Sequence, residues 1–497
     1  MAGVDVRPGQ AQCTVAVDLE GQVLTSDGQQ QEVSGKGLDY LTYKVLKEIG
    51  VSAVGKRLEL LQEFQKLKKL RDHAIAGVSV DSLHYKVFND RIHGQIELHP
   101  LCVRIIDTPQ FQRLRYIKQL GCAYLVFPGA AHNRFEHSIG VCYLAESFCR
   151  TLQYRQPELN ITEKDILCVQ IAGLCHDLGH GPFSHMFDQL FIPTVRQGSE
   201  WKHEKASVDM FDHLIEANQL IDVFAKYGLD AQDINFIKEL IKRGKKKPLR
   251  DTGRNKDKNF LYEIVANERN GIDVDKWDYF QRDCENLAIS SSFDSRRFEK
   301  FCRVIEVDGE KQICTRDKEV ANVYDMFYTR YSLHRRAYQH KVVKIIESML
   351  VEALVKANDH FLVKGKEGNM LQMSEAIDDM VAYTNMTDDI ILQIMRSDEP
   401  ALAESRHILE MVQRRELYKF IGKTQPTQEH DHGMDFRKKN TVQKMDTMDQ
   451  NTVEERDPMD QIKEDIIQAQ KPEDMDGEPL EADQLIIHVR AVYLLYT

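Results

Sequence analysis

The feature that most constrains the fold is an almost wholly apolar run of eleven residues, 165–175, that ends directly in a His-Asp pair. Such a run predicts a buried helix, and at this length it cannot span a membrane. Two glycines and a proline within residues 179–182 then end the helix and turn the chain back. The run therefore delivers His176 and Asp177 to the interior, where an unpaired carboxylate is costly.

Four side chains from separate parts of the sequence form a candidate metal site. They are two imidazoles and two carboxylates: His137, His176, Asp177 and Asp275. This mixture suits one divalent ion of iron, zinc or manganese, and four protein ligands on an octahedral ion leave positions open for water. The alternative is that the histidines are core residues with satisfied hydrogen bonds and that the His-Asp pair arose by chance. The further histidines that follow Asp177 favour the metal site.

Several residues near these motifs in the sequence could transfer a proton. They are three imidazoles and two carboxylates: His180, His185, His203, Asp188 and Glu204. The carboxylates would orient or polarise the imidazoles. We expect His203 and His180 to be the first candidates for a catalytic histidine, with a structural core role as the alternative for each.

Two helices are expected to present charged faces to this site. One face carries two cations, an imidazole and a phenol at spacings of four, four and three: Arg330, His334, Tyr338 and Lys341. The other carries residues spaced by four, with a lysine beside the metal ligand: Asp275, Tyr279, Asp283 and Lys276. The alternative for both helices is a solvated face with its own salt bridges.

The composition limits the class of protein. With 497 residues, the chain has room for about three domains or for one large helical enzyme with appendages. Ten cysteines without a CxxC pair indicate a reducing compartment. The net charge of −12 argues against a general nucleic-acid-binding surface, so an anionic substrate needs a local basic pocket. There is no Walker loop, no dinucleotide-binding glycine motif and no signal sequence, so we expect no membrane partner.

The chain is expected to be mainly α and to divide into four segments. These are an N-terminal segment without fixed structure (1–35), a short helical segment (36–72), a large helical body (85–426) and a charged, largely disordered C-terminal segment (427–497). Small β-hairpins are expected at residues 301–314 and 361–373. The basic loop 242–250 is either a nuclear-localisation signal or a solvated loop.

Four runs of sequence carry a specific resemblance: HNRFEHS, CHDLGHGPFSHMFD, NGIDVDKWDYF and LHRRAYQHK. They resemble the HD-domain phosphohydrolase superfamily, and within it the vertebrate SAM- and HD-domain-containing deoxynucleoside triphosphate triphosphohydrolases, from about residue 86 to about residue 426. Residues 36–72 resemble the last helices of a SAM domain. The resemblance implies a helical HD-domain core and the metal ligands named above. It also implies attack of activated water on the α-phosphorus of a deoxynucleoside triphosphate (dNTP), which releases deoxynucleoside and tripolyphosphate.

The resemblance also implies a set of substrate contacts. Tyr338 and Leu120 would crowd a ribose 2′-hydroxyl and thereby favour deoxyribose. The other implied contacts are Gln119, Arg134, His180, His185, Lys276, Tyr279, Asp283, Arg330, His334 and Gln339.

The resemblance further implies activation by nucleotides that bind between subunits and assemble a homotetramer. GTP or dGTP would occupy one site and a dNTP its neighbour, with Mg²⁺ between their phosphates. The implied residues of the first site are Lys86, Val87, Asp107, Gln112 and Arg115. Those of the second are Asn89, Val126, Phe127, Arg297, Arg316, Lys318, Asn322, His340, Lys341, Arg415 and Lys419. The family continues into a C-terminal lobe, so we expect the chain to be truncated or divergent there and its assembly to suffer more than its active site.

Three hypotheses for the function follow. The first is a dNTP triphosphohydrolase of the nucleus, with the cytoplasm as the alternative location, that lowers dNTP pools and restricts retroviral DNA synthesis. The second is an HD-type phosphodiesterase or nucleotidase, which would not release tripolyphosphate. The third is an inactive partner that binds single-stranded nucleic acid, against which the acidic net charge and the complete ligand set argue.

Overall fold

The computed structural model describes residues 16–17, 22–24, 30–32, 85–242 and 253–420. Three expected features lie outside the described residues: the SAM-like helices (36–72), the basic loop from residue 243 to 250 and the charged C-terminal segment (427–497). The chain divides into two units, and the residues of the candidate site all lie in the second. The first unit is Met1–Val87, Glu97–Val103 and Asp222–Leu229, and the second is Phe88–Ile96, Arg104–Ile221 and Asp230–Thr497.

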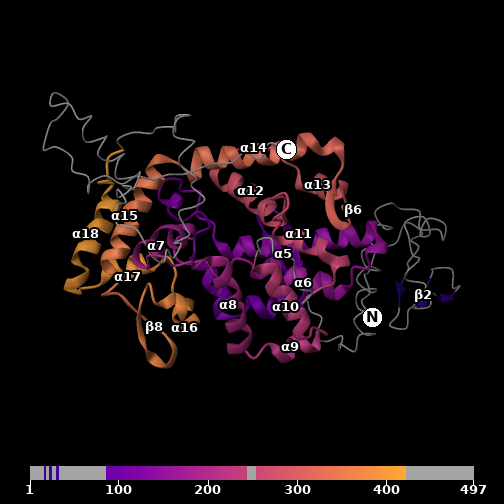
Figure 1. The fold of residues 1–497 in the computed structure, drawn as a ribbon, viewed down its shortest axis with the longest axis horizontal. Helices are drawn as coiled ribbons and strands as arrows, with labels where there is room; N and C mark the ends of the chain where they lie inside the picture. The colour runs from indigo at the N-terminus through magenta and orange to yellow at the C-terminus, as the bar shows by residue number, and fades with distance from the viewer. Residues whose placement is uncertain (1–15, 18–21, 25–29, 33–84, 243–252, 421–497) are drawn as a thin grey trace, which may run out of the picture. The chain divides into compact units, whose positions relative to one another are not determined.

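The described chain is mainly α, which confirms the expected fold class (Figure 1). The helices of ten or more residues are α5 (Arg134–Arg155), α6 (Glu163–Cys175), α8 (His203–Ala217), α10 (Ala231–Ile241), α12 (Val274–Leu287), α14 (Val320–Leu333), α15 (Lys341–Ala357) and α18 (Ala403–Arg414). The shorter ones are α3 (Pro100–Ile106), α4 (Pro109–Gln112), α7 (Ile192–Val195), α9 (Ile221–Lys226), α11 (Tyr262–Val265), α13 (Ser295–Phe301), α16 (Met380–Thr384) and α17 (Ile390–Arg396). None of the described helices is long and apolar enough to cross a membrane.

The strands form small antiparallel hairpins beside the helices. Both predicted hairpins are confirmed: β6 (Cys302–Val307) pairs with β7 (Glu310–Thr315), and β8 (Leu362–Lys364) pairs with β9 (Met370–Gln372). A third hairpin, β4 (Lys86–Asp90) with β5 (Gly94–Leu98), was not predicted. The sequence also predicts no fixed structure in residues 1–35, whereas the structure has a three-stranded sheet there: β1 (Ala16–Val17), β2 (Gln22–Leu24) and β3 (Gln30–Glu32). In this sheet β2 pairs antiparallel with both β1 and β3, a pairing that composition alone does not reveal.

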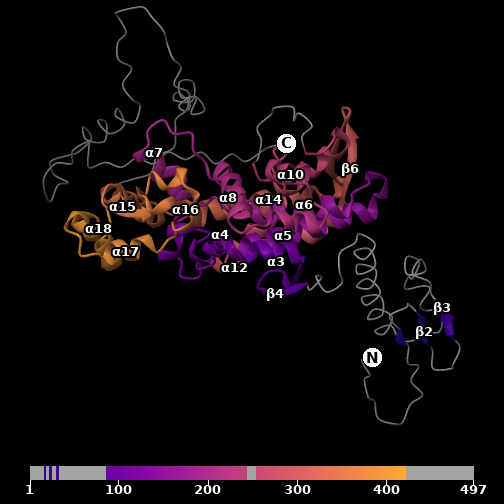
Figure 2. The same ribbon diagram turned by 90° about the horizontal axis from the view of Figure 1, so that it is seen from below.

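Three helices of the second unit position the candidate site. Helix α5 packs against α6 and α12, and α6 packs against α10 on another side. Both views show α5 and α6 next to each other (Figure 1, Figure 2). Every residue of α6 from Asp165 to Cys175 is buried, so the apolar run forms the buried helix that it predicts. A separate group of helices, α15, α17 and α18, packs together in the same unit.

In the first unit, the described part is held partly by aromatic contacts. The ring of His99 meets the ring of Tyr85 edge-on at 5.8 Å between centroids, and the ring of Tyr227 at 4.8 Å. Edge-to-face pairs at these separations are the favoured geometry for aromatic rings.

Candidate active site

Each candidate metal ligand stands at or near a helix end, and a cap fixes the N-terminus of each of the three helices. Helix α5 begins with a capping box between Asn133 and Glu136, which places His137 in its first turn. Helix α6 begins with a capping box between Thr162 and Asp165, and its apolar body ends at the His-Asp pair. Helix α12 begins at the cap residue Asp273, whose side chain accepts from the Lys276 N–H. The first turn of that helix therefore presents Asp275.

The four candidate ligands converge on one point. The Nε2 atom of His137 lies 3.2 Å from Asp275 Oδ1 and 3.4 Å from Asp177 Oδ2. The Nε2 atom of His176 lies 3.4 Å from the same two oxygens. With metal–ligand distances of about 2.1 Å, neighbouring ligand atoms lie about 3.0 Å apart in an octahedron and about 3.4 Å apart in a tetrahedron. These nitrogen–oxygen distances therefore fit a shared ion, and the ligand atoms of His137, His176 and Asp275 all lie within 4.8 Å of one another.

The hydrogen bonds of the two imidazoles support the same conclusion. Both Nε2 atoms are buried, and neither has a hydrogen-bond partner among the described residues. The opposite nitrogens are paired: His137 Nδ1 with Asp278 Oδ2 at 2.7 Å, and His176 Nδ1 with the Gly173 carbonyl at 2.8 Å. This arrangement leaves the Nε2 atom of both rings to face the carboxylates, which is the orientation that a metal-bound histidine takes. The donor set therefore fits a divalent metal, and its role as ligand set stays a prediction.

Charges around the site hold the candidate carboxylate Asp177 ionised. Burial alone would raise the pKa of Asp177, but His176 and Arg134 together hold that pKa well below its ordinary value. The Arg134 Nη1 atom donates to Asp177 Oδ2 at 2.5 Å. Burial lowers the pKa of His137, yet the carboxylates of Asp177, Asp275 and Asp278 hold it well above its ordinary value when no ion is present. A bound cation would replace this proton.

The five predicted proton-transfer residues form a second cluster beside the first. The rings of His180 and His203 stack at 4.0 Å between centroids, and His203 Nδ1 pairs with Asp188 Oδ2 at 2.7 Å. His185 Nδ1 lies 3.5 Å from Asp188 Oδ1, and its side chain is 54% exposed. Glu204 Oε2 lies 3.5 Å from His203 Nδ1. His180 Nε2 lies 3.3 Å from Asp177 Oδ1 and so joins the two clusters.

The loop that follows Asp177 is shaped to bring these histidines together. A Cβ on Gly179 would lie 2.2 Å from the Ser207 nitrogen and 2.3 Å from the His203 carbonyl oxygen, so only glycine lets the loop approach helix α8 this closely. Phe183 and Ser184 both take positive φ angles, of 56° and 55°. These angles turn the loop back toward the site.

Two residues that hold this loop were missed in the sequence. Arg113 is buried and donates to the carbonyls of Leu178 at 2.9 Å and His180 at 2.8 Å. Asp388 Oδ1 accepts from the Phe183 N–H at 2.6 Å, and its Oδ2 accepts from the Lys118 N–H at 2.8 Å. No sequence motif marks either residue, because both act on backbone groups far away in the chain.

Several of the expected substrate residues contact one another or neighbouring side chains. The Tyr338 hydroxyl donates to Asp283 Oδ2 at 2.5 Å, and Asp283 Oδ1 pairs with His132 Nε2 at 2.7 Å. The rings of His334 and Tyr338 meet at 4.9 Å. His132 was missed, although it opens the run HNRFEHS. Gln119 is buried, and its backbone carbonyl accepts from Arg134 Nη2 at 3.3 Å. Leu120 and Gln339 are half-buried.

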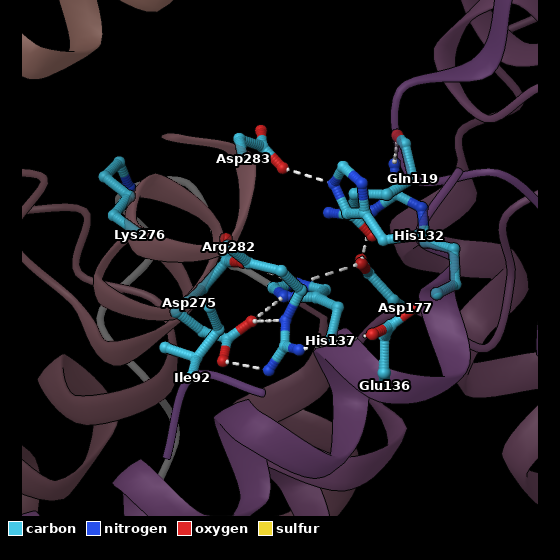
Figure 3. A network of polar contacts seen from close by, with 12 residues as sticks. Ile92, Gln119, His132, Glu136, His137, Asp177, Asp275, Lys276, Arg282 and Asp283 are labelled. Carbon is cyan, nitrogen blue, oxygen red and sulfur yellow. Dashed lines mark hydrogen bonds and ion pairs between the residues drawn. The ribbon is translucent and has the colours of Figure 1, made fainter. Parts of the chain in front are cut away.

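The remaining expected substrate residues lie on helices α12 and α14. The ring of Tyr279 meets that of His137 edge-on at 6.4 Å. Burial raises the pKa of Tyr279, and the charge of Arg330 opposes this shift, which places the two side chains within electrostatic range. Lys276 Nζ pairs with Asp273 Oδ2 at 2.9 Å. In Figure 3, Lys276 and Asp283 are seen near the edge of the polar network around His137.

The expectation that Arg330 and Lys341 share one helix face is wrong. Helix α14 ends at Leu333, and the next five residues, His334–Tyr338, form a π-helical turn. A new helix, α15, begins at Lys341. A π-turn widens the helix by one residue, so the spacing of four, four and three does not keep one face.

The residues implied for the nucleotide sites form local groups. For the first site, Arg115 Nε donates to Gln112 Oε1 at 2.8 Å. For the second, one group includes Arg297 and Asn322, which contact Glu319 and Asp294, and Arg316, whose guanidinium lies 5.9 Å from the Phe301 ring. Another group pairs the His340 ring with Phe127 and the Arg415 guanidinium with the Leu125 carbonyl. Lys341 Nζ lies 5.6 Å from the centre of the Phe420 ring. The other implied residues lie elsewhere in the described part of the chain: Lys86, Val87, Asn89, Asp107, Val126, Lys318 and Lys419.

Comparisons with known proteins match the chain in two regions. The HD domain model matches residues 134–283, and the SAM domain (sterile alpha motif) model matches residues 29–68. Deoxynucleoside triphosphate triphosphohydrolase SAMHD1 of Homo sapiens is 55% identical over 82% of this chain and 65% of the relative. The protein of the same name from Gallus gallus is 62% identical over 69% of this chain and 56% of the relative.

A more distant relative is covered more completely. The HD domain-containing protein L394 of Acanthamoeba polyphaga mimivirus is 34% identical over 68% of this chain and 73% of that protein. By contrast, the chain spans less than two thirds of the length of the human and chicken relatives.

Proposed function

The chain belongs to the HD-domain protein family that includes the SAMHD1 proteins, and on this basis we propose that it is a metal-dependent deoxynucleoside triphosphate triphosphohydrolase. The reaction would convert a dNTP and water to a deoxynucleoside and tripolyphosphate. The observation that carries this proposal is that two buried imidazole Nε2 atoms, of His137 and His176, each lie 3.2–3.4 Å from one oxygen of Asp177 and one oxygen of Asp275.

The residues His137, His176, Asp177 and Asp275 would hold one divalent ion of iron, zinc or manganese. Such an ion, when bound, would lower the pKa of a water molecule and polarise a phosphoryl oxygen. Arg134 sits beside Asp177 and would stabilise the negative charge that develops on the phosphate during the reaction. Lys276 and Arg330 would add positive charge around the triphosphate, which the acidic chain otherwise repels.

The second cluster would supply the proton for the leaving deoxynucleoside oxygen. Burial and the neighbouring charges of Arg134 and His203 hold the pKa of His180 well below its ordinary value, so this ring is neutral. Asp188 orients His203 through Nδ1 and lies near His185, whose exposed ring can reach a substrate. Tyr338 and Leu120 would close the sugar pocket against a 2′-hydroxyl. Asp283 holds Tyr338 in place for this role.

We also propose that nucleotides control the activity. GTP or dGTP and a dNTP, bridged by Mg²⁺, would bind between chains and assemble a homotetramer. The residues implied for the second site lie in separate clusters of one chain. This separation supports a site that residues of more than one chain form together. We place the protein in the nucleus, where it would lower dNTP pools, limit retroviral DNA synthesis and influence DNA replication and repair. Single-stranded nucleic acid is a further proposed partner.

The test is to incubate the purified chain with dGTP, GTP and Mg²⁺ and to identify the products by chromatography. Deoxyguanosine and tripolyphosphate in equal amounts are expected, and His176→Ala should abolish them. Release of pyrophosphate or of a single phosphate would refute the triphosphohydrolase and point to the nucleotidase. Assembly is tested by light scattering with and without nucleotides, where Arg316→Ala should remain unassembled and the exposed-site control Lys300→Ala should behave as wild type.

A further inference from the structure

The carboxylate of Asp278 lies behind the candidate metal ligand His137 and accepts four hydrogen bonds. Its Oδ2 pairs with His137 Nδ1 at 2.7 Å and with Arg282 Nε at 2.9 Å. Its Oδ1 pairs with His93 Nε2 at 2.7 Å and with Arg282 Nη2 at 2.9 Å. A carboxylate offers about four lone-pair positions, so Asp278 is fully occupied and has no freedom to turn. Its side chain is completely buried.

The network continues from Asp278 to the turn between β4 and β5. Arg282 is also completely buried, and its Nη1 atom reaches Asp90 Oδ2 at 2.9 Å. Asp90 Oδ1 accepts from the backbone N–H groups of Ile92 and His93, each at 2.8 Å. The hairpin turn thus contributes one carboxylate and one imidazole to the network. In Figure 3, the side chains of Arg282 and His137 lie close together.

Helix α5 is shaped to receive the network. A Cβ on Gly140 would lie 1.9 Å from Asp278 Oδ1 and 2.6 Å from Arg282 Nη2. Glycine is less favourable than alanine inside a helix. Gly140 is explained by the space that the Asp278–Arg282 pair needs. This observation supports the network independently of its hydrogen bonds.

We propose that Asp278 is a positioning residue for the metal and that the β4–β5 turn controls metal retention through Arg282 and His93. The physical reason is that an Nδ1–H bond to a fixed carboxylate sets the tautomer and direction of His137 and strengthens Nε2 as a ligand. Any shift of Asp90 or His93 moves Asp278 and therefore this ligand. The inference rests on the metal site of the proposed function and not on its nucleotide substrate.

The first experiment titrates the chelator-stripped full-length chain with Mn²⁺ alone in a calorimeter. Loss of an outer carboxylate of this kind weakens metal binding by about tenfold to about a hundredfold, and we expect Asp278→Asn to fall in this range. Asp90→Asn, which touches no metal ligand, should weaken Mn²⁺ binding in the same direction by a smaller factor. Arg91→Gln is the matched control, because Arg91 lies in the same turn but makes only an exposed ion pair with Glu285 at 3.0 Å. It should bind Mn²⁺ as wild type does.

The second measurement separates positioning from general destabilisation. The thermal unfolding midpoint is recorded with and without Mn²⁺ for wild type, Asp90→Asn and Gly140→Ala. If the network positions the metal ligand, Mn²⁺ should raise the unfolding midpoint of both variants by less than it raises that of wild type. A purely structural role predicts lower midpoints with an unchanged rise on addition of Mn²⁺, and that result would overturn the proposal. If Asp278→Asn does not fold, these two variants decide the question. A chain that shows these metal effects but makes no tripolyphosphate contradicts the proposed function and leaves this inference intact.

Discussion

At the scale of single residues, the expected choice of deoxyribose depends on how Tyr338 is held. Burial and the charge of Asp283 hold the pKa of the Tyr338 hydroxyl well above its ordinary value, so the hydroxyl stays protonated and donates to Asp283. Asp283 is held in turn by His132. The ring of Tyr338 is therefore fixed before a sugar arrives.

Replacing this ring tests its role in sugar selection. In Tyr338→Ala the space beside C2′ opens, and we expect the ratio of kcat/KM for dGTP over GTP to fall by about tenfold or more. Tyr338→Phe keeps the ring and should keep most of the preference. The measurement is steady-state hydrolysis of both nucleotides, and an unchanged ratio in the alanine variant would remove Tyr338 from the sugar pocket.

A second residue-scale prediction concerns Asp188, which holds His203 through Nδ1. Asn at this position keeps the size but loses the charge that orients and supports a protonated imidazole. General acid–base catalysis contributes about a hundredfold to about ten-thousandfold, and kcat of Asp188→Asn should fall within that range while metal content stays constant. Asp212→Asn, on the helix α8 that carries His203, breaks only an exposed ion pair with Lys238 and serves as control. Equal kcat values for the two variants would exclude the orienting role.

At the scale of elements, the sequence predicts what local pattern determines and misses what distant packing determines. Helix α6 follows from its own apolar run, and the two hairpins β6–β7 and β8–β9 follow from alternation around glycines. The π-turn His334–Tyr338 does not follow from the sequence, because the residues before and after it have the same helical spacing. Asp278 was overlooked inside a quoted motif, since only the fold shows that it faces His137. Convergence of four ligands could be expected, but the groups that orient them could not.

The loop between α6 and α8 gives an element-scale prediction. In Gly179→Ala the new methyl group would collide with the backbone of α8, which cannot move aside as a flexible side chain can. Overpacking of this kind lowers stability by about 1–3 kcal/mol. We expect this loss in urea unfolding, together with a lower kcat as His180 and His203 separate. Wild-type stability in this variant would contradict the close approach of loop and helix.

At the scale of the whole molecule, the carboxyl group of Asp388 links global stability to pH. Burial raises its pKa to about 7, against the opposing effects of the Phe183 and Lys118 N–H groups and the charges of Lys118 and Arg113. An unfolded aspartate has a pKa of about 3.9, so the folded chain binds this proton more tightly than the unfolded chain. The stabilising contribution is therefore complete below about pH 3.9 and is lost as the pH rises through about 7.

Asp388→Asn removes this titration and isolates its effect. Between pH 4 and about pH 7, the free energy of unfolding of wild type should fall relative to that of the variant, by at most about 1.4 kcal/mol per pH unit for one proton. Urea unfolding of both proteins at half-unit steps from pH 5 to pH 8 measures this difference, and other titrating groups cancel because both proteins share them. Because Asp388 joins the backbone of Lys118 to that of Phe183, its ionisation also couples the loop that carries Gln119 to the loop that carries His185. Parallel stability curves would show that Asp388 keeps an ordinary pKa, and the proposed link between pH and the two loops would then be lost.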